Sequence, residues 1–240
     1  MRSGNPALKA TTFTQAPSLG SDKVMSIQGT VNKTFLLLLI TVFSASWVWD
    51  NPARFLPFIW LGVIGGFIVA LVTVFKKELS PITSPIYAFV EGLVLGAISA
   101  IFERSYPGIV IQAVALTFGT LFCLLMAYKS RLIKVTENFK LGVVAATGGI
   151  FLIYLVSFIM GFFGKTIPFI HESGLIGIGF SLFVVIIAAL NLVLDFDFIE
   201  KGAEYGAPKY MEWYGAFALM VTLIWLYLEI LRLLSKTRRR

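Results

Sequence analysis

Seven stretches of predominantly apolar residues, each about as long as a bilayer is thick, dominate this chain of 240 residues. They lie at residues 31–49, 55–75, 85–102, 108–128, 140–163, 173–198 and 210–235. An apolar run of about 18 or more residues with few charges is typical of a transmembrane helix. Barrel strands are shorter and alternate apolar with polar residues, so continuous runs favour helices. The sequence therefore predicts an all-α integral membrane protein with seven transmembrane helices in one bundle.

The composition agrees with this class, because 58% of the residues are hydrophobic and only 14% are charged, whereas soluble domains carry about 25% charged residues. Residues 1–30 are polar and predict a disordered tail. Residues 31–235 form one transmembrane domain, and residues 236–240 a basic tail. The first apolar run starts too late for a cleaved signal peptide, so we expect its helix to be retained.

The positive charges predict the orientation of the helices. The connections after the second, fourth and sixth runs hold two, four and two Lys or Arg residues, if Lys140 at the start of the fifth run is counted, and those after the first, third and fifth hold one each. Basic connections stay in the cytoplasm, so the N-terminus is expected inside, in a cell membrane. The net charge of +7 is thus explained by topology and anionic lipid, and no nucleic-acid partner is expected. The basic C-terminal tail disagrees: either the last run does not fully cross, or its helix has an external basic end.

Enzyme signatures are missing from the sequence. We find no G-x-S-x-G, no H-E-x-x-H and no cysteine pair, since Cys123 is the single cysteine. The lone His171 lies in an expected external connection, where a surface role is more common than metal binding. The sequence therefore predicts neither an enzyme nor a bound cofactor.

Four acidic residues fall within or beside the apolar runs: Glu91, Asp195, Asp197 and Glu229. Ionisable groups at membrane depth are costly and are often functional. On a helix, Asp195 shares a face with Asn191, whereas Asp197 points about 200° away, toward the side of Lys201. Asp197 is therefore interpreted as part of a solvated helix end, and Asp195 as the deeper acid.

Two of these acids have a structural alternative. Glu229 has Arg232 three residues later and could form a local ion pair with it. Glu91 lies one turn from Tyr87 and could be a protonated, hydrogen-bonded structural residue.

The segments "LDFDFI" and "LYLEILRLL" resemble the paired motifs in the last two helices of the Bax-inhibitor family, the transmembrane Bax-inhibitor-motif proteins. "SPIYAFVEGLVLGAI" is similar to the family's third helix, and "VMSIQGTVNKTFLLLL" to the lead-in of a bacterial branch. On this match Asp195 and Glu229 take the two acidic positions, Asp197 takes a neighbouring polar position, and Lys76 or Lys77 takes the basic position after the second helix. The sequence departs from the pattern in having Glu for the second Asp, and in a longer separation of the acids around "EYGAPKYMEWYGAF".

The resemblance implies a calcium leak that responds to pH, with calcium and protons as its permeant or regulating ions. Asp195 and Glu229 would share a proton, since two close carboxylates in low dielectric do not both ionise easily. Deprotonated, they would bind calcium transiently through oxygen. Two alternatives remain: a non-conducting regulator that binds other membrane proteins in stress or protease regulation, and a proton-coupled cation antiporter.

Overall fold

A computed structural model describes residues 24–164 and 174–239. Six helices are long and apolar enough to cross a membrane, and a shorter apolar helix, α4 (Ile59–Phe75), makes the seventh. The six are α2 (Ile27–Trp49), α5 (Ser80–Ser105), α6 (Ile109–Lys129), α7 (Glu137–Phe162), α8 (Leu175–Glu204) and α9 (Met211–Arg238). The seven apolar helices expected from the sequence are thus present in the described part of the chain.

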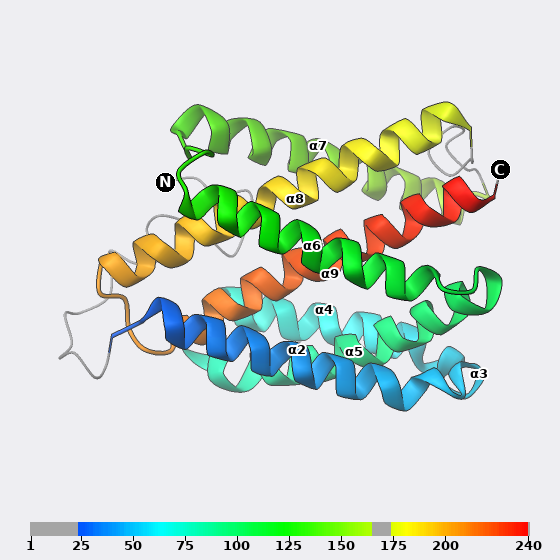
Figure 1. The fold of residues 1–240 in the computed structure, drawn as a ribbon. Coiled ribbons are helices and arrows are strands. Elements are labelled where there is room, and N and C mark those ends of the chain that lie inside the picture. Colours follow the sequence, from blue (N-terminus) through cyan, green and yellow to red (C-terminus); the bar gives the residue numbers. More distant parts are fainter. Residues whose placement is uncertain (1–23, 165–173, 240) are drawn as a thin grey trace. The chain divides into compact units, whose positions relative to one another are not determined.

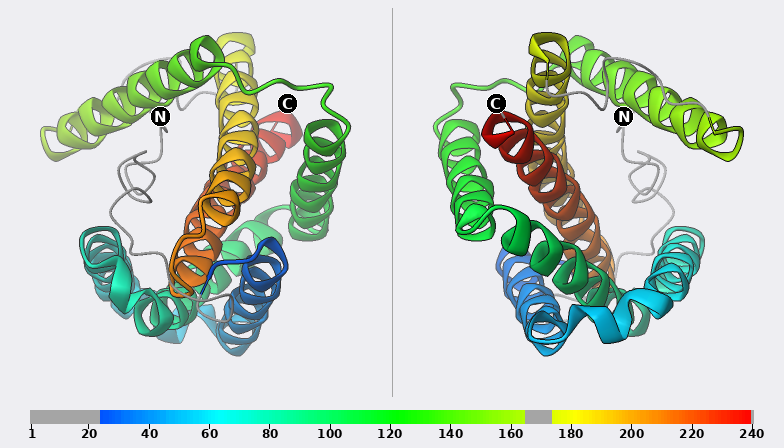
Figure 2. Two further views of the ribbon diagram at one scale, coloured as in Figure 1. Left: turned by 90° about the vertical axis from the view of Figure 1, so that its left-hand side faces the viewer. Right: turned by 90° about the vertical axis from the view of Figure 1, so that its right-hand side faces the viewer.

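Several boundaries differ from the prediction. The second run, predicted as 55–75, begins at the last residue of α3 (Pro52–Phe55) and continues as a 3-10 turn η2 (Leu56–Phe58) and α4. Figure 2 shows α3 leading from α2 to α4. Pro57 explains the break, because proline removes a backbone donor and interrupts a helix. Another 3-10 turn, η3 (Lys77–Leu79), leads into α5, where a proline in the first turn suits the start of a helix.

The predicted tails also differ at their inner ends. Residues 27–30 of the polar tail belong to α2, and residues 236–238 of the basic tail belong to α9. Residues 1–23, His171 and Arg240 lie outside the described residues. At 28 residues, α9 is about 42 Å long at 1.5 Å per residue, which is enough to cross a bilayer.

The chain divides into two compact units. Among described residues, the amino-terminal unit holds residues 24–107 and 197–221, and the carboxy-terminal unit holds residues 108–164, 174–196 and 222–239. The helices α8 and α9 each contribute to both units.

Glycines set the helix packing in the amino-terminal unit, where α5 contacts both α2 and α4 (Figure 1). A Cβ atom at Gly92 would lie 2.5 Å from the carbonyl oxygen of Thr41, and one at Gly96 would lie 2.7 Å from Cα of Ala45. On α4, a Cβ atom at Gly62 would lie 2.7 Å from a methyl group of Val94. Because only glycine fits at these crossings, the helix backbones come close together, as in other small-residue contacts in membranes.

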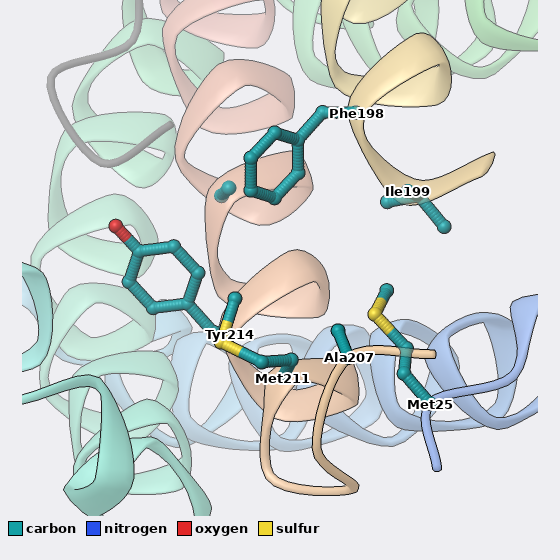
Figure 3. Packing of buried hydrophobic residues seen from close by; sticks show 7 residues of the cluster. Met25, Phe198, Ile199, Ala207, Met211 and Tyr214 are labelled. Carbon is teal, nitrogen blue, oxygen red and sulfur yellow. The ribbon is translucent and has the colours of Figure 1, made fainter. Parts of the chain in front are cut away.

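Each unit has its own apolar core. In the amino-terminal unit, the end of α8 and the start of α9 pack around one cluster, shown in Figure 3. Its buried members are Met25, Phe198, Ile199, Ala207, Met211, Tyr214 and Ala218. In the carboxy-terminal unit, Ile150 of α7 packs against Val184 and Ile187 of α8.

Candidate functional site

Asp195 is nearly fully buried, with 1% of its surface exposed. Asn191, one turn earlier on α8, is buried as well, and its amide nitrogen donates hydrogen bonds to Oγ1 of Thr147 on α7 and to the carbonyl oxygen of Ile187, both at 2.8 Å. The helix positions Asp195 and Asn191 on one face, as the sequence predicts. This face of α8 therefore brings a carboxylate and an amide together inside an apolar helix.

Asp197 lies on another side of α8 and forms a local ion pair. Its Oδ2 accepts a hydrogen bond of 2.7 Å from the ammonium of Lys201, one turn later. Both side chains keep some exposure, 14% for Asp197 and 24% for Lys201. This i,i+4 pair agrees with the interpretation of Asp197 as part of a helix end.

Glu229 is held in the carboxy-terminal unit by two partners. Nη1 of Arg232 donates hydrogen bonds to its carboxylate oxygens at 3.0 and 3.1 Å. The hydroxyl of Tyr154, on α7, also donates to the carboxylate, at 3.0 and 3.1 Å. Glu229 is only 2% exposed, so the local ion pair proposed as its structural alternative is what the structure contains.

Asp195 and Glu229 lie at different levels of the α8–α9 pair. The ammonium of Lys236 on α9 donates to the carbonyl oxygen of Gly177 and to Oγ of Ser181 on α8, at 3.1 and 2.8 Å. The two helices are antiparallel. Glu229, seven residues before Lys236 on α9, therefore lies level with about residue 186 of α8. Asp195 lies roughly nine residues further along α8, or about 14 Å at 1.5 Å per residue.

The expected proton-sharing pair of Asp195 and Glu229 stays a prediction. In the structure Arg232 supplies the counter-charge of Glu229, and this register places Glu229 at another level than Asp195. Residues 24–164 and 174–239 contain no cluster of three or more His, Cys, Asp or Glu side chains suited to a metal ion.

The other predicted residues lie in the amino-terminal unit. Glu91 is partly buried against α4, where a Cβ atom at Gly66 would lie 3.1 Å from its carboxylate. Lys77, a candidate for the basic partner, has its ammonium 5.8 Å from the centre of the Tyr214 ring. Lys76 caps the end of α4, where its backbone N–H donates to the carbonyl oxygen of Val72 at 2.8 Å.

The sequence analysis missed a fully buried carboxylate, Glu212, at the start of α9. It accepts hydrogen bonds from the backbone N–H of Ser26 at 2.9 Å and from the Ser26 hydroxyl at 2.8 Å. It also forms ion pairs with Lys33 and, at 2.9 Å, with Lys209. An acid in the first turn of a helix is common at the water boundary, so the sequence carried no signal that this one is enclosed.

One family of known proteins matches almost the whole chain. The family described as Bax inhibitor 1 like matches residues 5–239, a range that includes every apolar helix and all the acidic residues considered above. No curated protein and no solved structure gives a significant match. The protein, a multi-pass membrane protein with seven apolar helices among its described residues, therefore belongs to the Bax inhibitor 1 like family.

Proposed function

We propose that this protein is a pH-sensitive calcium leak in a cell membrane, with Asp195 as its titrating group and with its N-terminus in the cytoplasm. The observation that carries the proposal is the near-complete burial of Asp195 within the apolar helix α8. A carboxylate at such a depth favours the protonated form unless water or a cation lies beside it, since the ionised form costs about 2.5 kcal/mol or more there. Protonation of Asp195 is thereby coupled to the presence of ions in the bundle.

Asn191 is the second oxygen donor on this face. Its amide nitrogen is used by Thr147 and Ile187, which fixes the amide and leaves Oδ1 as its acceptor atom. Carboxylate and amide oxygens are the ligands that calcium prefers. Ionised Asp195 would bind a passing calcium ion with help from Asn191, and protonated Asp195 would not.

Glu229 has a different role in this proposal. Its charge is balanced by Arg232, and Tyr154 links it to α7, so it holds α7 and α9 together instead of exchanging a proton with Asp195. A single buried carboxylate, in place of a pair, then sets the pH response.

Calcium flux into liposomes containing the purified protein tests this proposal. The flux of the wild type should change with pH, because protonation of Asp195 removes a charged oxygen ligand for calcium. Asp195→Asn should flatten this pH dependence. Asp197→Asn is the matched control, since it removes an acid two residues away that is paired with Lys201, and its pH dependence should remain that of the wild type.

Other outcomes favour the alternatives. If purified protein gives no flux at any pH, a non-conducting regulator that binds other membrane proteins becomes the better interpretation. A flux that requires a pH gradient, and stops when the gradient is collapsed, indicates a proton-coupled antiporter. Equal pH dependence in Asp195→Asn and the wild type would remove Asp195 from the mechanism.

A further inference from the structure

A short segment before α2 lies against the connection between α8 and α9. The backbone N–H of Met25 donates to the carbonyl oxygen of Ala207 at 2.6 Å, and Val24 forms an isolated antiparallel bridge with Pro208. Met25 is 4% exposed and packs in the same apolar cluster as Ala207 and Ile199 (Figure 3). We call Val24–Ser26 the amino-terminal strap.

Glu212 fastens this strap. Both the backbone N–H and the hydroxyl of Ser26 donate to its carboxylate. The ammonium groups of Lys33 and Lys209 approach the same carboxylate from α2 and from the α8–α9 connection. Lys33 also lies 5.5 Å from the centre of the Trp213 ring. Four hydrogen-bond donors from three parts of the chain therefore converge on one fully buried acid.

The first turn of α2 contains a glycine that lets the helix backbone come close to this carboxylate. A Cβ atom at Gly29 would overlap the carboxylate group of Glu212, so only glycine allows the contact. Further along α9, a Cβ atom at Gly215 would lie 3.2 Å from Thr30 of α2 and 3.3 Å from Ile199 of α8. The strap thus continues into a close contact of α2, α8 and α9.

The residues that meet the strap lie close together in the sequence, in the α8–α9 connection and the start of α9, within "EYGAPKYMEWYGAF". Ala207, Pro208, Lys209 and Glu212 all belong to that segment. One short segment therefore supplies the contacts of Ala207, Pro208 and Glu212 with the strap.

We propose that the amino-terminal strap is a latch that holds the end of α8 in place and keeps the leak low, and that opening the Glu212 cluster raises it. α8 is one continuous helix from Leu175 to Glu204, so a shift at its end is transmitted to Asp195, nine residues before Glu204. Removal of one member of a buried ion cluster is strongly destabilising, because the remaining charges lose their compensation. Loss of one member of the Glu212 cluster should therefore release the strap. The effect on the leak rests on the function proposed above, whereas the latch itself does not.

Thiol labelling tests the latch without any flux measurement. Met25→Cys, in a Cys123→Ser background, places a reporter at a buried position of the strap. In the otherwise wild-type protein a maleimide should label it slowly, and Glu212→Gln should raise the labelling rate at least tenfold. Glu204→Gln is the matched control, because Glu204 is an exposed acid eight residues away, and it should leave the rate unchanged.

Gly29→Ala is a second way to open the latch, and it changes no charge. It should raise the labelling rate of Met25→Cys as Glu212→Gln does, and circular dichroism should show that both variants keep their helices. Slow labelling in both variants would show that Glu212 does not fasten the strap and would overturn the proposal.

The link to the leak is tested with a cross-link and liposome flux. Val24→Cys and Pro208→Cys, in the same Cys123→Ser background, place two thiols across the bridge. The disulfide should hold calcium flux at or below the wild-type level, and reduction combined with Glu212→Gln should raise the flux at least threefold. If labelling becomes fast and the flux still responds to pH but does not rise, the strap does not control the leak. No flux in the wild type would instead refute the proposed function, and the labelling rates would still decide whether the latch exists.

Discussion

Arg232 lies one turn after Glu229 on α9, and its Nη1 atom donates to both oxygens of the Glu229 carboxylate. The same nitrogen donates to the hydroxyl of Tyr154 at 2.7 Å. The three side chains thus form a closed triangle that links α7 to α9. The carboxylate is buried and the guanidinium is partly exposed. Substitution of Arg232 and substitution of Glu229 should therefore change the stability of the protein by different amounts.

We expect Arg232→Gln to destabilise the protein by about 2–3 kcal/mol, because it leaves the buried charge of Glu229 without a cation. Glu229→Gln should cost less, since a neutral amide can still accept from Tyr154. Thermal unfolding in detergent should therefore rank the wild type above Glu229→Gln, and Glu229→Gln above Arg232→Gln. The reverse order would show that the pair does not stabilise the bundle.

Substitution of Gly92 or Gly96 tests the packing of α2 on α5. A Cβ atom at either position would overlap the backbone of α2, so Gly92→Ala and Gly96→Ala should each cost about 1–3 kcal/mol. Gly119→Ala on α6 is the control, since no atom lies within 4 Å of its Cβ position. It should be neutral or stabilising by up to ~1 kcal/mol. Equal melting temperatures for all three variants would argue against this packing.

The hydrogen bond between Asn191 and Thr147 joins α7 to α8 in the carboxy-terminal unit. A double-mutant cycle with Asn191→Leu and Thr147→Val should give a coupling of about 0.6 kcal/mol, and no more than ~1.7, as for other interhelical hydrogen bonds in membranes. Unfolding of the four proteins in mixed micelles provides the measurement. A coupling of zero would mean that the contact is not formed in the membrane.

Cysteine accessibility tests the proposed orientation. In a Cys123→Ser background, Lys134→Cys in the α6–α7 connection should react only from the cytoplasmic side, because four basic residues of that region favour the cytoplasm. Asn51→Cys, between α2 and α3, should react only from the other side. Both positions are exposed in the structure, so a lack of labelling cannot be due to burial in the protein. Reaction of both from one side would refute the seven-span arrangement.

The sequence predicted the helices well because hydropathy reports directly on the length of a membrane-spanning segment. The break before α4 was missed because Pro57 stands inside an otherwise continuous apolar run. The glycines of α5 pack against α2, since small residues four apart share one face of a helix.

The site was harder to predict than the fold. Hydropathy places an acid within a helix. It does not report which residues of two neighbouring helices lie level with each other, because this depends on the connection between the helices. The α8–α9 connection places Glu229 at another level than Asp195. Arg232 was recognised as an alternative partner of Glu229 because i,i+3 spacing is visible in sequence. Tyr154 was not, because it comes from α7. Burial of Glu212 depends on Ser26 and Lys33, which lie 186 and 179 residues earlier, and no local sequence pattern reports such distant contacts.

The short length of α4 has a consequence for the surrounding lipid. Its 17 residues span about 25 Å at 1.5 Å per residue, less than the ~30 Å of a typical hydrocarbon core. Trp60 and Phe75, close to its two ends, are 64% and 80% exposed, which suits side chains at the level of lipid headgroups. Lipid next to α4 must therefore thin to match the helix, or the helix must strain against a thicker bilayer. The stability of this protein should therefore depend on the acyl-chain length of the surrounding lipid, and should be higher in bilayers of shorter-chain lipids.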